Sequence, residues 1–371
     1  MKILIIASEF DADAQIVQWG LQILGCEAVI MDWENFPTRQ YGCWQMSSTD
    51  SERYSFSDGA NELLAPFDVI WYRRAGQPMP NAQQGSQDFK IIHTESMLYL
   101  RSVVLALGHS NTLWVNPFTS AQRAELKVPQ LKAAKAVGFN IPDTLIGNDF
   151  IQIKAFFDRH QHGIIYKAFT SGKWRNADGS ATVLRTAALT EEHFSNPLAI
   201  SACPGIYQEH IQKAYELRVT VIGDKVLAVK VDSQTNGKSV DWRYDSNLRD
   251  FPLSAINLPP RIAHMCLALC REMDLVFGCI DLIVDVDGNY VFLEINQAGQ
   301  FLWIENIVPE IPLLDAFCRY LASGGDANAT LPQERIIPRE WLETDSFADF
   351  KARQIAKYGE PKPKNTPLNE E

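Results

Sequence analysis

The chain has 371 residues, of which 46% are hydrophobic, and its formal net charge at pH 7 is −11. This length predicts two or three globular domains with large cores, and the acidic balance argues against general nucleic-acid binding, which relies on basic surfaces. No apolar run approaches the length of a membrane span, and the opening MKILIIA is too short for a signal peptide. We therefore expect a cytoplasmic protein whose partners include neither nucleic acid nor a membrane.

The first third of the chain alternates strand and helix patterns. The runs KILIIA, EAVIMDW, FDVIWYRR and TLWVN are predicted strands, and helices are predicted over residues 11–24 and about 87–107. Residues 40–61 are rich in Ser, Asp and Gly and predict a long excursion or irregular hairpin. This order predicts an open α/β domain over residues 1–118.

A second unit is predicted over residues 119–205. Its predicted elements are a helix beginning at Lys127, a strand at 144–146, a helix at 150–160 and the strand GIIYKAF. Lys167 lies within that otherwise apolar strand, where it is either a solvated edge residue or a phosphate ligand that acts as a point charge. The loop 170–179 after it contains glycine, and its backbone amides could close over phosphates.

A third unit, residues 206–325, is predicted to be mainly antiparallel. It contains GIYQEHI, a hairpin that turns at Gly223-Asp224, a helix at about 260–273 and a late helix at about 313–322. Glu216 and Arg218 share one face of the first hairpin strand, and Arg243 follows in SVDWRYD. For Arg218 and Arg243 a surface ion pair is an equally open alternative, because exposed pairs are common and weak.

The stretch CIDLIVDVDGNYVFLEIN, which ends at Asn296, predicts a second hairpin with an electrostatic conflict. Asp287-Gly288 between two apolar runs is typical of a two-residue hairpin loop. In that register Asp281 lies opposite Glu294, with Asn296 on the same face. That face also carries Tyr290 and Phe292, whereas the opposite face is aliphatic and predicted to be core: Ile280, Leu282, Val284, Val291, Leu293 and Ile295.

Like charges placed directly opposite each other destabilise a sheet, and three interpretations of Asp281 and Glu294 are open. Both acids point into water, one of them is protonated, or a cation lies between them. The aliphatic set supports the register, because a slip of one residue would send it to solvent. Asp, Glu and Asn oxygens are ligands that suit Mg²⁺, which usually leaves positions for phosphates, and this favours the cation.

No zinc pattern is expected. The seven cysteines are odd in number and scattered along the chain. Cys266 and Cys270 lie four residues apart in a predicted helix, but no second pair accompanies them, which predicts buried free thiols. His160 and His162 are expected to mark a helix end rather than a metal site.

Residues 326–371 are a predicted C-terminal extension. A Thr or Asp start and a Gly stop predict a short amphipathic helix over 346–358, and PKPKNTPLNEE after it is expected to be disordered. We expect an extension without a docking role, because chain ends are often loose.

The order of these features resembles the ATP-grasp superfamily. It consists of Lys127 before a helix, Lys167 in a strand, the strand end QEHI, Glu216 before Leu-Arg, and then Asp281, Glu294 and Asn296. The resemblance is closer to the graspetide synthetases, the microviridin-type ATP-grasp maturases of ribosomal peptides. It is carried by WYRR at 71–74, ELRVTVIGDKVLAVKVDSQ at 216–234, DWR at 241–243 and LEINQAGQFLWIE at 293–305. It covers roughly residues 1–322 and departs at Gln297, where many relatives have proline.

The resemblance implies an α/β and α+β architecture: an N-terminal open α/β (pre-ATP-grasp) domain, a small central domain and a C-terminal antiparallel-sheet domain, with ATP between the last two. It implies Mg²⁺ and ATP as cofactors. The implied roles are as follows: Lys127 and Lys167 contact phosphates; the backbone of Gln208, Glu209, His210 and Ile211 reads adenine; Glu216 holds the ribose; Asp281, Glu294 and Asn296 bind the metal; and Arg243, Arg218 and Lys167 are catalytic.

The implied reaction is carboxylate activation. An Asp or Glu side chain of a ribosomal precursor peptide becomes an acyl phosphate, and Ser, Thr or Lys then forms an ester or amide crosslink. Arg73 and Arg74 would hold the acidic core of the peptide through bidentate contacts, with solvated strand-end arginines as the alternative. The leader would dock on residues 170–205, which contain Trp174, Arg175 and Arg185.

Two other functions stay open. One is an ATP-grasp ligase that adds a free amino acid or amine to a small-molecule or protein carboxylate, and the other is a non-catalytic nucleotide-binding partner protein. The bond type, the ring number, the leader motif and the choice between monomer and homodimer also stay open.

Overall fold

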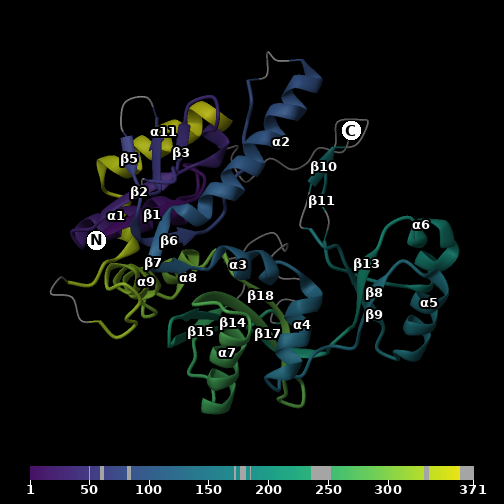
Figure 1. Ribbon diagram of the computed structural model, residues 1–371. Helices are drawn as coiled ribbons and strands as arrows, with labels where there is room; N and C mark the ends of the chain where they lie inside the picture. Colours follow the sequence, from purple (N-terminus) through teal and green to yellow (C-terminus); the bar gives the residue numbers. More distant parts are fainter. Residues whose placement is uncertain are drawn as a thin grey trace.

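The computed structural model describes residues 1–49, 51–58, 62–81, 85–170, 173–175, 181–183, 185–234, 252–329 and 334–359. Figure 1 shows an N-terminal lobe in purple and blue, a central lobe in teal and a C-terminal lobe in green below the first. Within these ranges, no helix has the length and apolar character that crossing a membrane would need.

The N-terminal lobe is built on a parallel sheet with the order β2-β1-β6-β7. Its elements are β1 (Lys2–Ile6), α1 (Ala12–Ile23), β2 (Glu27–Met31), η1 (Trp33–Asn35), β6 (Phe67–Tyr72), α2 (Ser86–Val103), η2 (Val104–Ala106) and β7 (Gly108–Val115). The apolar run of β1 is buried on both faces, as in other covered parallel sheets: Ile3 and Ile5 pack in the core under α1, Leu4 and Ile6 in the core under α2. The predicted open α/β sheet is confirmed.

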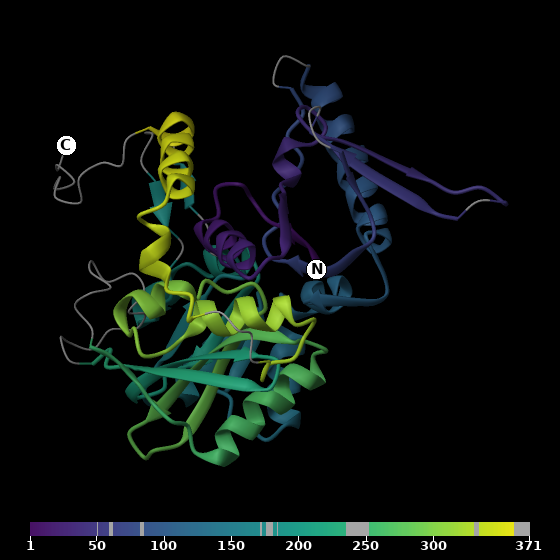
Figure 2. The same cartoon turned by 90° about the vertical axis from the view of Figure 1, so that its left-hand side faces the viewer.

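The predicted excursion is a separate antiparallel sheet. It consists of β3 (Tyr41–Gln45), β4 (Arg53–Ser57) and β5 (Glu62–Leu64). Tyr54 and Phe56 of β4 are buried in the core beside α2, so this sheet is anchored at one end. Its other end, where β3 meets β4, extends away from the body of the protein (Figure 2).

The central lobe is a four-stranded antiparallel sheet with helices on one side. Its elements are β8 (Thr144–Gly147), α5 (Phe150–Arg159), β9 (Ile164–Lys167), β12 (Ala187–Ala188), η3 (Glu191–Ser195), α6 (Pro197–Ser201) and β13 (Gly205–Glu209), with the two-stranded sheet β10 (Lys173–Arg175) and β11 (Ala181–Val183) beside them. Because β13 pairs with both β8 and β9, the expected boundary at residue 205 is wrong: this strand belongs to the central lobe, not to the third unit.

The C-terminal lobe is a five-stranded antiparallel sheet with the order β16-β15-β14-β17-β18. Its elements, with the helices that pack on it, are α3 (Phe118–Ala124), α4 (Lys127–Ala136), β14 (Lys213–Ile222), β15 (Lys225–Val231), β16 (Leu253–Ala255), α7 (Pro260–Glu272), β17 (Phe277–Asp285), β18 (Tyr290–Asn296), α8 (Leu302–Ile307) and α9 (Leu313–Ala322). α4 and α7 cover one face. Phe277 and Cys279 at one end of β17 instead join the core that β1, α1 and α9 share. One core therefore connects the N-terminal and C-terminal lobes.

The β17–β18 hairpin confirms the central pairing but not the turn. Asp281 lies opposite Glu294, as predicted. The loop has three residues, 286–288, because the amide of Asp285 bonds to the carbonyl of Asn289 at 3.0 Å, and Gly288 supplies the positive φ of 81° that such a loop requires. The two-residue turn predicted from Asp287-Gly288 is therefore wrong.

A β-bulge at Leu293 restores the predicted register at the acids. Leu282 pairs with Phe292 and Asp281 with Glu294, so that Leu293 has no opposite residue. As a result, the residues of β18 between the turn and the bulge point to the faces opposite to those predicted. Phe292 lies in the core, whereas Leu293 lines a pocket on the other face together with Ile283.

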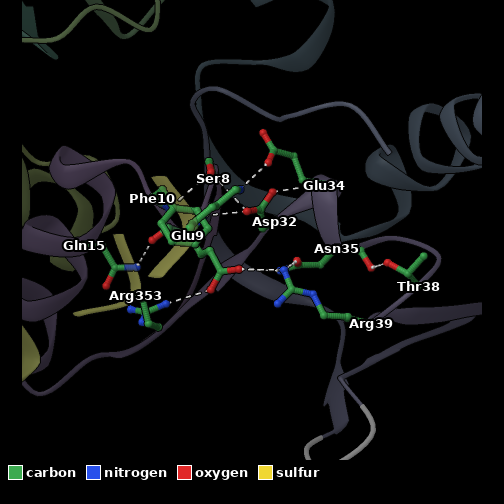
Figure 3. Close-up of polar contacts among 11 residues, drawn as sticks. Ser8, Glu9, Phe10, Gln15, Asp32, Glu34, Asn35, Thr38, Arg39 and Arg353 are labelled. Atoms are coloured by element: carbon green, nitrogen blue, oxygen red, sulfur yellow. Dashed lines mark hydrogen bonds and ion pairs between the residues drawn. The ribbon is translucent and has the colours of Figure 1, made fainter. Parts of the chain in front are cut away.

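The end of the chain packs against the N-terminal lobe. α10 (Pro338–Trp341) and α11 (Asp345–Tyr358) follow α9, which confirms the predicted helix. Arg353 lies 2.9 Å from Glu9, an acid that also pairs with Arg39 at 3.2 Å (Figure 3). Figure 2 shows α11 in yellow beside the N-terminal lobe. The residues of α11 are therefore not a loose chain end, whereas the expectation that the extension docks no partner stays a prediction.

Replacing Phe350 by alanine should destabilise the protein by about 3–5 kcal/mol, the usual cost of removing a buried aromatic ring. Phe350 is 3% exposed and lies in the core shared with α1. Denaturant unfolding measures the effect, and Lys351→Ala, one residue along on the exposed side of α11, is the matched control. Equal stability of the two variants would show that α11 is not part of the cooperative fold.

Candidate active site

The two facing acids of the hairpin are each paired with a cation of the protein. Arg218 on β14 places Nη1 2.6 Å from Oδ1 of Asp281. Lys127, the first residue of α4, places Nζ 2.5 Å from Oε2 of Glu294. The four side chains are 12% to 27% exposed. The predicted repulsion is thus offset by two protein cations, an arrangement that none of the three interpretations included.

Arg218 is held in one position and stays charged. Its Nη2 donates to the carbonyl of Gln300 at 3.2 Å, in addition to the contact of Nη1 with Asp281. Burial disfavours the charge, but the Asp281 carboxylate holds the pKa of Arg218 above its ordinary value. Its Nε is buried without a hydrogen-bond partner. A fixed cation with an unused donor suits binding of an anion.

A pocket opens between the central and C-terminal lobes. Ile165 of β9 lines it from the central sheet, and Ile283 and Leu293 line it from the C-terminal sheet. Its remaining lining residues include Lys167, Gln208, Glu209, His210, Ile211, Lys213 and Glu216. Apolar side chains from two sheets with polar groups at the margin can hold a flat heterocycle.

The segment 208–211 supplies backbone donors at the edge of this pocket. The amides of Glu209 and His210 already donate to protein carbonyls, at 2.9 and 3.1 Å. In the described part of the chain, the Ile211 amide has no internal acceptor. Ile211 is therefore the donor of this segment that a ligand can use.

Glu216 is positioned by two neighbours in the same pocket. Lys213 places Nζ 2.5 Å from Oε1 of Glu216, and Ser233 Oγ donates to the same oxygen at 3.0 Å. Lys213 was not among the residues predicted from the sequence. Its signal was a lysine three residues before Glu216, at the start of an apolar strand.

A second pocket lies at Glu294. Lys127, Glu294 and Asn296 line it, with Phe169 and Thr170. The bulge places Leu293 at the first pocket and Glu294 at the second. The predicted residues that line the two pockets are Lys127, Lys167, Gln208, Glu209, His210, Ile211, Glu216, Glu294 and Asn296. Asp281 lies opposite Glu294 on β17, and Arg218 is bound to Asp281.

The two strand-end arginines have different environments. Arg73 is buried, and its guanidinium donates to Asp11 and Asp13, both at 2.9 Å, and to the carbonyl of Gly299 at 3.3 Å. A substrate cannot reach it, so the expected substrate contact of Arg73 is wrong; it joins the N-terminal lobe to the loop after β18. Arg74 is exposed, and its Nε donates to the carbonyl of Ala298 at 3.1 Å.

Other predicted residues are placed only in part. Arg243 lies outside the described residues. Trp174 and Arg175 lie on β10, with side chains outside the described part, and Arg185 is exposed two residues before β12. The predicted leader surface therefore stays a prediction.

The comparisons with known proteins agree with this geometry. Residues 133–309 match the family model of the RimK-like ATP-grasp domain. No curated protein matches the chain. The chain thus contains a RimK-like ATP-grasp domain, and it is an enzyme of the ATP-grasp ligase type.

The solved structures similar to the chain are more specific. The macrocyclase MdnC of Microcystis aeruginosa MRC, bound with the precursor peptide MdnA, is 26% identical with a TM-score of 0.77, over 87% of this chain and 100% of that one. A RiPP-associated ATP-grasp ligase of Chryseobacterium gregarium, in complex with ADP and a leader and core peptide, is 25% identical with a TM-score of 0.76, over 91% of this chain and 99% of that one. The macrocyclase MdnB of Microcystis aeruginosa MRC shares the fold at 22% identity, with a TM-score of 0.71 over 86% of this chain and 98% of that one. The ATP-grasp fold expected from the sequence is confirmed.

Proposed function

We propose that the chain activates Asp or Glu side chains of a ribosomal precursor peptide with MgATP and joins them to Ser, Thr or Lys as esters or amides. The observation that carries this proposal is the position of Asp281 and Glu294. They face each other on one hairpin, and β18 of that hairpin lines both pockets, through Leu293 and Glu294. Fold alone does not define a reaction, whereas this set of charges is suited to phosphoryl chemistry.

The residues at the second pocket fit Mg²⁺. Asp281, Glu294 and Asn296 are oxygen donors from the facing strands of one hairpin. Asn296 is exposed, and its Oδ1 accepts one bond, from the Ala298 amide at 3.0 Å. A divalent cation there would share the two carboxylates with Lys127 and Arg218.

The first pocket fits the nucleoside of ATP. Its apolar walls would hold the adenine, the Ile211 amide would donate to the ring, and Glu216, held by Lys213, would accept from the ribose hydroxyls. Lys167, at the margin of the same pocket, would contact the phosphates as a point charge.

When bound, MgATP would supply the phosphoryl group that turns a carboxylate into an acyl phosphate, with ADP as the leaving group, and an alcohol or amine that attacks the acyl carbon would then displace inorganic phosphate. Phosphoryl transfer needs positioning and charge neutralisation more than a covalent nucleophile. Lys127, Lys167 and Arg218 supply positive charge, and Arg218 is already fixed by Asp281 and Gln300. Donors fixed before the reaction act without reorganisation. Arg243 is proposed to assist them.

A peptide substrate is supported by the comparison structures and by Arg74. The two more similar of the structures above contain a precursor peptide or a leader and core peptide. Arg74 follows β6, at the carboxyl ends of a parallel sheet where open α/β folds bind ligands. Its exposed guanidinium would bind an acidic core residue. A ribosomal substrate places the reaction in the cytoplasm.

Mass spectrometry of a co-expressed candidate precursor tests the proposal. The precursor should lose the mass of one water per crosslink. It should stay unmodified when it is co-expressed with the Glu294→Gln variant of the enzyme. An unmodified precursor together with ATP-dependent addition of a free amino acid to another carboxylate would move the assignment to the second ligase class. Nucleotide binding without turnover on either substrate would favour a non-catalytic partner protein.

A further inference from the structure

Three segments of the central lobe bring Asp143, His160 and Glu209 to one point. Asp143 directly precedes β8, His160 ends α5, and Glu209 is the last residue of β13. Each offers one ligand atom, and the three atoms lie within 4.8 Å of one another. This set is separate from the acids of the β17–β18 hairpin, which belong to the C-terminal sheet.

The imidazole of His160 is oriented for metal binding. Its Nδ1 lies 2.6 Å from the carbonyl oxygen of Phe156, and because a carbonyl only accepts, Nδ1 carries a hydrogen. In the neutral ring Nε2 is then a lone pair, and it lies 3.3 Å from Oδ2 of Asp143. The ring packs on Phe156, with 4.4 Å between the centroids. Histidines that bind a metal usually donate the N–H of their other ring nitrogen to a carbonyl or a carboxylate, as Nδ1 of His160 does here.

Two carboxylates and the lone pair of Nε2 therefore converge, with little positive charge nearby to offset them. Of the described lysines and arginines, none forms an ion pair with Asp143 or Glu209. In the part of the chain that the structure describes, the one donor between the acids is the amide of Asp143, which lies 3.5 Å from Oε2 of Glu209, the limit of a hydrogen bond. Either a proton on His160 or a metal cation must relieve this arrangement, and the proton serves only one of the two carboxylates.

We propose that Asp143, His160 and Glu209 bind a divalent transition-metal ion of the zinc type. One imidazole nitrogen and two carboxylate oxygens are ligands that zinc accepts, in a three-ligand set that leaves a fourth position open. Mg²⁺ prefers oxygen ligands and retained waters, so it is a poor competitor for the imidazole. The side chain of Asp143 is 70% exposed and free to close on the ion. His160 does end a helix, as expected from the sequence, and the geometry adds this second role.

The ion would cross-link the end of α5 to the strands β8 and β13. Glu209 and the neighbour of Asp143, Pro142, line the first pocket, so the metal would stiffen one edge of that pocket. A ligand that binds only the folded state stabilises it by mass action. The proposal does not depend on the ligase assignment, because metal binding is measured without nucleotide or substrate.

The test is a Zn²⁺ titration of the full chain by calorimetry, after treatment with a chelator and in a large excess of Mg²⁺, which saturates the other acidic site. We expect one equivalent of Zn²⁺ to bind and to raise the melting temperature. His160→Ala should lower the affinity for Zn²⁺ by at least about 100-fold and abolish the rise in melting temperature. Losing a metal ligand costs more than losing the group that hydrogen-bonds to that ligand, which already costs about 10–100-fold. His162→Ala is the matched control, because His162 lies nearby but bonds to Gln212 at 3.2 Å.

Asp143→Asn guards against misfolding of the His160 variant, because Asp143 is too exposed for its replacement to disturb packing. It should also weaken Zn²⁺ binding. Co²⁺ should give weak visible bands without the strong near-ultraviolet bands of a thiolate ligand. Unchanged Zn²⁺ affinity in both variants, no binding to the parent chain, or thiolate bands from exposed Cys43 or Cys203 would each overturn the proposal.

Discussion

Replacing Glu294 by glutamine should lower turnover with the true substrate by about 10²–10³-fold, the range seen when one preorganised charge-stabilising group is lost. The carboxylate lies opposite Asp281 and 2.5 Å from Lys127. Glutamine keeps the size of the side chain but removes the charge that Mg²⁺ needs. Steady-state rates at several Mg²⁺ concentrations measure the effect, and we expect the Mg²⁺ requirement to rise as well.

Two further variants separate a metal ligand from a structural ion pair. Glu272→Gln lies on the exposed end of α7 and should leave the rate unchanged. If Glu294 only served to fix Lys127, then both Glu294→Gln and Lys127→Met would lose rate without any change in the Mg²⁺ requirement, whereas a metal ligand raises that requirement in Glu294→Gln. Full turnover in the Glu294→Gln variant would show that the assignment of the metal site is wrong.

Replacing Arg73 by alanine should lower the free energy of unfolding by about 3–5 kcal/mol, the cost of removing one partner of a buried ion pair. The guanidinium is fully buried between Asp11 and Asp13, which would be left without their cation. Denaturant unfolding measures the loss. Arg74→Ala is the neighbouring control and should cost much less, at most about 1.5 kcal/mol, because Arg74 is exposed and gives up one hydrogen bond to a carbonyl.

The deficit of the Arg73 variant should also depend on pH. Burial raises the pKa of Asp13, while Arg73 acts to lower it. Without Arg73 that pKa rises further, and protonation then removes the uncompensated charge from the folded state. The loss of stability should therefore shrink as the pH falls, and a deficit that grows in acid would contradict this account.

A comparison of the Arg73 and Arg74 variants separates an effect on folding from an effect on substrate binding. Arg74→Ala should keep most of the stability of the parent chain but raise the KM for an acidic precursor by about 10-fold or more, since a charge-assisted hydrogen bond contributes about 1.5–3 kcal/mol. An unchanged KM would leave Arg74 as a solvated strand-end residue, which was the alternative open from the sequence.

The correct pairing of Asp281 with Glu294 came from two errors that cancel. The sequence pattern predicted a two-residue turn, and the loop has three residues, which moves the strands by one position relative to each other. The bulge at Leu293 moves them back before the acids are reached. The alternation of apolar residues could not reveal the bulge, because Leu293 and Phe292 are both apolar. The sequence pattern therefore does not tell which of the two lies in the core and which lines the pocket.

The sequence by itself determined the class of the N-terminal and C-terminal sheets, the order of the lysines, acids and arginine along the chain, and the facing acids, because alternation with a period of two and the spacing of motifs are local properties of a chain. Only the tertiary structure decided that Lys127 and Arg218 neutralise those acids, that Arg73 is buried while Arg74 is exposed, that β13 joins the central sheet, and that α11 docks on the N-terminal lobe. These outcomes depend on which residues meet across long sequence separations. Burial and charge pairing are settled between segments, so no single segment records them.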